Sequence, residues 1–135
     1  MEQVMNQSPH GTLLAYVRAF ETLDQENVLP FYNLPCMFIA PPGAVVVSDA
    51  TAARALVSQL IEQARGQGYR RTELRDVDPR TLSENLALIA GVFVRFDAGD
   101  QEIARFGFQY TMRNAGDGWK IVVALAHDLP GTAAR

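Results

Sequence analysis

The sequence predicts an α+β fold in which helices cover one face of an antiparallel sheet. Apolar residues recur at helical spacing in the first half of the chain, whereas from Tyr69 onward they alternate with polar residues as strands do. Turn signals at residues 78–79, 98–100 and 114–118 divide this second half into an antiparallel meander. Because helices and strands are segregated along the chain, a parallel sheet built from βαβ units is not expected.

Two helices are expected before the first strand. The first begins at Ser8 and Pro9, because serine caps free amides and proline loses no hydrogen bond in a first turn. Its apolar face consists of Leu13, Val17 and Phe20. A second, short helix is expected after Asn27, and it must end before Pro35 because a proline disfavours the helical conformation of the preceding residue.

A pair of short strands and a third helix follow. The strands are expected at residues 36–40 and 45–47, joined by a rigid Pro-Pro-Gly turn. The helix is capped by Ser48 or Asp49 and ends at Gly66. Its apolar stripe consists of Ala52, Leu56, Leu60, Ile61 and Ala64.

Composition restricts the class of partner. The chain has 135 residues, of which 48% are hydrophobic and 20% charged, as in one ordered globular domain. A net charge of −3 and scattered arginines argue against nucleic acid as a partner. No segment approaches the roughly 18 apolar residues that cross a membrane. The single cysteine, Cys36, cannot form an internal disulfide, so we expect a buried thiol and a reducing cytoplasm.

Three short segments carry a resemblance to a known family. They are Tyr16-Val17-Arg18-Ala19-Phe20, Leu29-Pro30-Phe31-Tyr32 and Gly118-Trp119-Lys120-Ile121-Val122. Together with the order of elements over residues 8–128, they resemble the nuclear transport factor 2-like superfamily. The resemblance implies one cone-shaped α+β domain, in which a curved antiparallel sheet and three N-terminal helices enclose a pocket. Residues 1–7 and 129–135 would then be flexible tails.

The superfamily includes ketosteroid isomerases, polyketide-cyclase-like enzymes, dehydratases and non-catalytic binding or assembly domains, so the fold alone does not determine function. Ketosteroid isomerase chemistry needs a carboxylate base and an oxyanion hole made by a tyrosine and a protonated aspartic acid. Tyr16 matches that tyrosine, but the base falls on Ala40 and the second acid on or near Phe108. Because alanine cannot accept a proton, steroid isomerisation by this mechanism is not expected.

Strand alternation predicts which residues face the pocket or core. One face of the third strand of the meander carries Phe106, Phe108, Tyr110 and Met112. Arg95, on the preceding strand, has two interpretations: it binds a ligand carboxylate through two hydrogen bonds, or it lies in solvent over aromatic surface. Tyr16 also has two interpretations: its hydroxyl is catalytic, or its ring is buried and the hydroxyl reaches water or a carbonyl.

The pair His127-Asp128 ends the last predicted strand, where strands of this fold often reach the mouth of the pocket. A histidine there can act as acid or base near neutral pH, although the pair is also typical of a turn. His10 is expected at the surface. The two histidines lack the spacing of metal ligands, and no phosphate-binding loop or serine-hydrolase motif is present, so no metal or cofactor is expected.

Three hypotheses for function follow. The leading one is a small, bacterial-type, cytoplasmic protein that binds an apolar or aromatic small molecule. Its expected ligand-binding residues are Tyr16, Phe20, Phe38, Arg95, Phe108 and Tyr110. The second is a lyase, isomerase or cyclase-type enzyme that uses His127 and Asp128 with Tyr16, which requires these groups to converge on one cavity. The third is a non-catalytic homodimeric assembly module that associates through the outer face of the sheet.

Overall fold

The first helix begins where its capping chemistry predicts. In the computed structural model, which describes residues 8–129, α2 (Pro9–Glu21) follows Ser8. The Ser8 side chain accepts a hydrogen bond from the Gly11 amide at 2.9 Å, so one of the free amides of the first turn is satisfied. The predicted start of this helix is confirmed.

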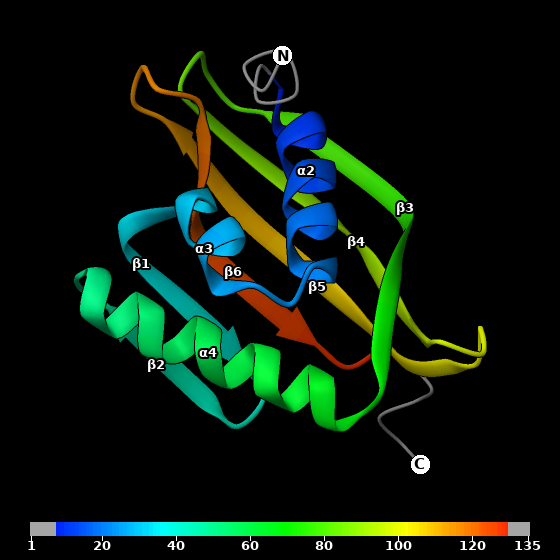
Figure 1. The fold of residues 1–135 in the computed structure, drawn as a ribbon. Helices are drawn as coiled ribbons and strands as arrows, with labels where there is room; N and C mark the ends of the chain where they lie inside the picture. The colour runs from blue at the N-terminus through cyan, green and yellow to red at the C-terminus, as the bar shows by residue number, and fades with distance from the viewer. Residues whose placement is uncertain (1–7, 130–135) are drawn as a thin grey trace.

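The remaining helical segments are α3 (Gln25–Val28), the short 3-10 helix η1 (Leu29–Phe31) and α4 (Ala50–Gly66). Asp49 caps α4 by accepting a hydrogen bond from the Ala52 amide at 2.9 Å, as predicted. The short helix begins earlier than predicted, because Asp24 rather than Asn27 caps it. Figure 1 shows α2, α3 and α4 on the same side of the sheet.

Six strands form one curved, unclosed sheet (Figure 1). They are β1 (Tyr32–Ala40), β2 (Gly43–Val47), β3 (Tyr69–Thr81), β4 (Leu86–Asp97), β5 (Glu102–Asn114) and β6 (Trp119–His127). Their spatial order is β2-β1-β6-β5-β4-β3, so β2 and β3 are the edges. The meander from β3 to β6 is antiparallel, as predicted, whereas β1 runs parallel to β6 and makes the sheet mixed. β1 also begins at Tyr32 instead of Cys36.

The turn predicted at Asp78-Pro79 is instead an irregularity within β3. The pairing of β3 with β4 shifts register between Arg75 and Asp78, and Asp76 has a φ of 54°. An edge strand tolerates Pro79 because one row of its backbone groups has no partner strand. The chain reverses at residues 82–85 instead.

The hydrophobic core lies between the helices and the concave face of the sheet. Its largest fully buried side chains include Phe108, Leu13, Ile89, Met112 and Ile121. From α4, Val57 and Ile61 pack against this cluster. The alternation of β4 and β5 therefore directs one set of apolar residues, which includes Ile89, Phe93 and Met112, toward the helices, as strand periodicity predicts.

Apart from Leu129, the two predicted tails, residues 1–7 and 129–135, lie outside the residues that the structure describes. Across residues 8–129, none of the helices combines the length and the apolar character that a membrane span requires.

Gly91 provides a test of how closely β4 and β5 pack. A Cβ at this position would lie 2.9 Å from Phe108 Cζ and 3.1 Å from the Arg75 carbonyl oxygen. Because the Phe108 ring is fully buried and cannot easily move, we expect Gly91→Ala to lower the free energy of unfolding by about 1–3 kcal/mol in urea denaturation. Gly66→Ala is the control: a Cβ there meets nothing within 4 Å, so stability should be unchanged or higher. Wild-type stability for Gly91→Ala would contradict this packing.

Candidate functional site

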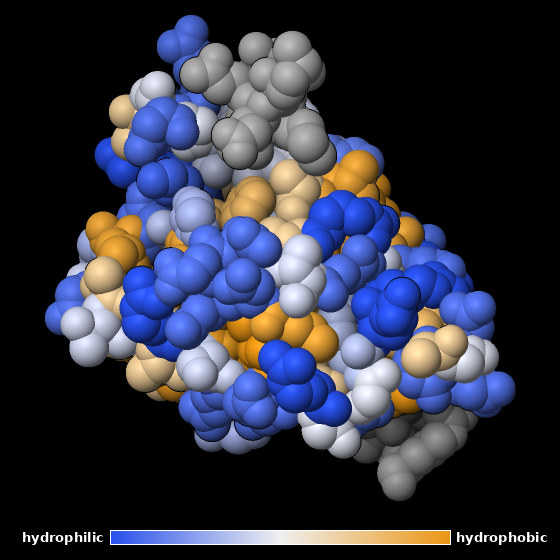
Figure 2. Space-filling view, viewed as in Figure 1, coloured by the Kyte–Doolittle hydropathy of each residue, from blue (hydrophilic) through white to orange (hydrophobic). Residues whose placement is uncertain are grey.

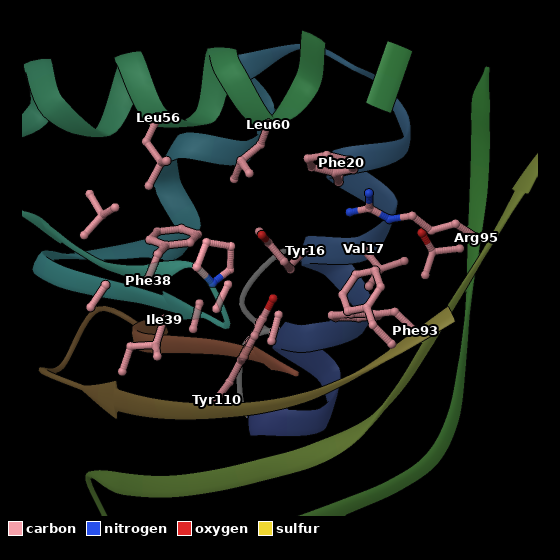
Figure 3. Close-up of a pocket in the computed structure, with 18 of the residues that line it drawn as sticks. Tyr16, Val17, Phe20, Phe38, Ile39, Leu56, Leu60, Phe93, Arg95 and Tyr110 are labelled. Carbon is pink, nitrogen blue, oxygen red and sulfur yellow. The ribbon is translucent and has the colours of Figure 1, made fainter. Parts of the chain in front are cut away.

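A cavity of about 500 Å³ lies between α2, α4 and the concave face of the sheet (Figure 3). Small-molecule sites in proteins typically measure about 300–1,000 Å³, so this space is large enough for a ligand. The residues that line it are Tyr16, Val17, Phe20, Phe38, Ile39, Ala40, Pro42, Gly43, Ala44, Val45, Leu56, Leu60, Thr72, Phe93, Arg95, Phe106, Tyr110, Ala124 and Ala126.

Large apolar side chains form the walls of the cavity. Leu56 and Leu60 are one helical turn apart on α4 and point toward the sheet, and Phe38 reaches in from β1 (Figure 3). Val57 and Ile61, on the adjacent stripe of α4, are buried in the core instead. In the space-filling view, hydrophobic residues are visible among hydrophilic ones where α4 lies against the sheet (Figure 2). The cavity is therefore mainly apolar.

Three tyrosines meet beside the cavity. The hydroxyl oxygens of Tyr16 on α2 and Tyr32 on β1 are 2.6 Å apart, which is a hydrogen bond between buried groups. Tyr110 on β5 packs edge-to-face against Tyr16, with ring centroids 6.2 Å apart. Tyr16 and Tyr110 line the cavity, whereas Tyr32 does not and supports Tyr16 from behind.

Burial keeps these three hydroxyls uncharged. It raises the pKa of Tyr16, Tyr32 and Tyr110 above the ordinary value, and repulsion between neighbouring phenolates raises each pKa further. The positive charge of Arg95 opposes this rise without overcoming it. At neutral pH the hydroxyls can donate or accept hydrogen bonds, but they supply neither a charge nor a strong base.

Arg95 on β4 brings a positive charge into this apolar space. Its guanidinium carbon lies 5.2 Å from each of the ring centroids of Phe20, Tyr69 and Phe106. Its Nε atom is buried and has no hydrogen-bond partner among the described residues. Of the described side chains that line the cavity, Arg95 alone is charged at neutral pH. The cavity therefore has one polar, cationic end.

Five of the six side chains predicted to bind a ligand line this cavity: Tyr16, Phe20, Phe38, Arg95 and Tyr110. The prediction for Phe108 is wrong in depth, although it faces the concave side as its strand register requires. Phe108 is fully buried and stacks beneath Phe93, with ring centroids 4.2 Å apart and planes at 21°. Phe93 covers it and takes its place in the cavity wall.

His127 and Asp128 do not converge with Tyr16, so the catalytic arrangement predicted for them is wrong. Ala126 lines the cavity, and His127, the next residue on β6, therefore points to the opposite face of the sheet. Its ring lies over Gly107, where an added Cβ would be 2.1 Å from the ring, and its Nδ1 is 2.9 Å from the carbonyl oxygen of Asp128. The histidine completes the outer surface of the sheet.

Sequence reasoning missed several lining residues. Leu56 and Leu60 belong to the apolar stripe predicted for α4, and only the tertiary structure shows that they border a space rather than the core. Phe93 shares its strand face with Arg95, which was the available signal. Ala40, at the position of the isomerase base, lines the cavity without a carboxylate. Within residues 8–129, no three His, Cys, Asp or Glu side chains are grouped as metal ligands would be.

The buried tyrosines predict a distinct response to alkaline pH. The chain has four tyrosines, and burial raises the pKa of Tyr69 as it does for the other three. Because the folded protein holds these protons more tightly than the unfolded chain, its stability should be intact below about pH 10 and fall as pH rises above it. Phenolate absorbance should therefore appear at higher pH in the native protein than in the chain unfolded in guanidinium. Coincident titrations of an intact fold would contradict this burial.

Solved structures with the same fold come from several bacteria. An NTF2-like protein with a cystatin-like fold from Novosphingobium aromaticivorans is 18% identical, with a TM-score of 0.72 over 91% of this chain and 80% of that one. A proposed dehydratase of the NTF2-like family from Streptomyces avermitilis is 12% identical, with a TM-score of 0.74 over 96% and 99% of the two chains. A proposed aromatic ring hydroxylase from Novosphingobium aromaticivorans is 12% identical, with a TM-score of 0.70 over 93% and 90%.

At these identities the structures share the fold and nothing more specific. A comparison with curated proteins found no match. A family model is more informative, because the model described as NTF2-like protein (DUF6841) matches residues 11–129, which include every element from the body of α2 to the end of β6. The chain therefore belongs to this NTF2-like family, as its element order and its cystatin-like sheet indicate.

Proposed function

We propose that this chain binds an apolar or aromatic small molecule in the cavity between α2, α4 and the sheet. The observation that carries the proposal is the cavity of about 500 Å³ with walls of aromatic and aliphatic side chains. Burial of apolar ligand surface against such walls is favourable by roughly 25 cal/mol per Å². The few polar side chains that line it, Arg95, Thr72 and the two tyrosines Tyr16 and Tyr110, would orient the ligand.

Binding is favoured over catalysis by the chemistry of the lining. No carboxylate or imidazole is present among the described lining residues, so a general base of the usual kind is lacking there. The raised pKa of Tyr16 and Tyr110 makes their hydroxyls hydrogen-bond donors rather than bases.

Cys36 is outside this proposed function. Its side chain is buried and does not line the cavity, and burial raises the pKa of its thiol, which lowers its reactivity. A single buried thiol suits a reducing compartment, so we propose a cytoplasmic location.

Filling the cavity should abolish binding. Leu60→Trp adds a bulky ring to the α4 wall, so we expect the affinity for a neutral apolar dye such as Nile red to fall by at least about tenfold. The matched control is Leu82→Trp, because Leu82 is 60% exposed in the turn between β3 and β4 and lies outside the cavity. Fluorescence titration of the three proteins gives the comparison. Equal dye binding by Leu60→Trp and the wild type, or no binding by the wild type, would refute the proposal.

A second proposal concerns the outer face of the sheet, which we propose associates with another copy of the chain. Leu86 and Leu88 on β4 are 42% and 41% exposed and lie on the same face of the sheet, and apolar side chains gathered on one face can form a contact surface. Leu88 borders a hollow on this face together with Val123 and Leu125 of β6. Asp78, Arg80, Gln109 and Thr111 border the same hollow, so it offers both apolar and polar groups for a symmetric contact between identical chains.

Sedimentation equilibrium tests this association. The wild type is expected to be a dimer at micromolar concentration. Leu88→Glu should be a monomer, because burying a carboxylate in the interface is costly and the neighbouring Arg80 already pairs with Asp78. Leu82→Glu, in the exposed turn, should remain a dimer. A wild type that stays monomeric at high concentration, or a Leu88→Glu variant that stays dimeric, would exclude this interface.

A further inference from the structure

We infer that the molecule bound in the cavity is an apolar carboxylic acid whose carboxylate pairs with Arg95. This inference rests on the proposed small-molecule function and names the class of its ligand. Arg95 projects from β4 into the same space that Tyr16, Phe38 and Leu60 border (Figure 3). A ligand would place its anionic group at the Arg95 end and its apolar body between α4 and β1.

Arg95 carries a positive charge that forms no ion pair with the described residues. An arginine remains protonated at any physiological pH, and removing such a cation from water is costly unless it is paired. Arg95 is partly buried, its Nε is unpartnered, and none of the ion pairs among the described residues includes it. Burial raises the pKa of Tyr16, Tyr32 and Tyr110, so their hydroxyls are neutral and do not balance the charge of Arg95.

Arg71, on β3 of the same sheet, is a comparison arginine whose charge is paired with carboxylates. Its guanidinium carbon lies 4.1 Å from the centroid of the Phe96 ring, so it also covers an aromatic side chain. Unlike Arg95, it forms ion pairs with two carboxylates, Glu73 at 2.8 Å and Asp100 at 3.1 Å. Aromatic contact therefore accompanies carboxylate pairing at Arg71, whereas at Arg95 only the aromatic contact is present.

The aromatic rings around Arg95 orient its guanidinium but do not neutralise its charge. Stacking uses the faces of a guanidinium, while its N–H donors lie in the plane and remain available for two parallel hydrogen bonds to a carboxylate. The described lining supplies one unit of positive charge, which matches a carboxylate better than a dianionic phosphate. Because the other walls are apolar, the rest of the ligand should be hydrocarbon or aromatic.

A pair of probes with one skeleton isolates the carboxylate. Isothermal titration calorimetry of the full chain at neutral pH would compare 2-naphthoate with the neutral alcohol 2-naphthalenemethanol. We expect the wild type to bind the acid at least about tenfold more tightly than the alcohol. Arg95→Met should remove that preference by weakening the acid, while the alcohol changes by less than about threefold. The matched control, Arg71→Met, also deletes a ring-stacked arginine and should keep the preference.

The outcomes separate this inference from the proposed function. Equal binding of acid and alcohol by the wild type, or a preference that survives Arg95→Met, would overturn the carboxylate inference and leave the apolar pocket intact. No binding of either probe or of Nile red would overturn both. If thermal denaturation shows that Arg95→Met does not fold, Arg95→Gln, which also removes the charge, replaces it. The same loss of preference for the acid is expected. If that variant is also unfolded, the preference of the wild type decides.

Discussion

The alternation of side chains along β4, β5 and β6 determines which chemical groups meet in the cavity. Neighbouring residues on a strand point to opposite faces, so Arg95 and Tyr110 face the helices while His127 faces away. A shift of one residue in register would exchange the two sets, directing Gln109 inward in place of Tyr110. The chemistry of the site therefore depends on the register that the meander imposes.

Within that register, the electrostatics of the cavity are simple. Burial keeps Tyr16 and Tyr110 protonated, and the described lining offers no carboxylate, so Arg95 is the one charged side chain among the described lining residues. Such a site can attract an anion, donate hydrogen bonds to it and exclude water from its apolar part. These properties suit ligand recognition. Proton abstraction would need a general base, and the described lining contains no carboxylate or imidazole.

The sequence was sufficient to predict the first and last helices and the antiparallel meander, because the signals for these elements are local. The Ser8 and Asp49 caps and the strand periodicity after Tyr69 all lie within a few residues of the structure that they specify. Strand alternation placed Tyr110 on the face toward the pocket or core, but it left Arg95 with two interpretations, a ligand-binding residue or one in solvent over aromatic surface. How deeply a side chain is buried was not predictable. Phe108 differs from a lining residue only because the Phe93 ring, from another strand, stacks on it. The parallel pairing of β1 with β6 is likewise a contact between distant segments that local patterns do not encode.

The cavity exists because small residues line it from the sheet. Ala40, Gly43, Ala124 and Ala126 line it from β1, β2 and β6, and side chains of this size cannot reach Leu56 or Leu60 across from them. Protein interiors are otherwise close-packed, and an empty apolar space forfeits the contacts of its walls. A ligand that fills this space would restore those contacts and stabilise the folded chain in proportion to its saturation. In the proposed function, the small residues opposite Leu56 and Leu60 leave the space for a ligand, and the unpartnered Arg95 would select its anionic group.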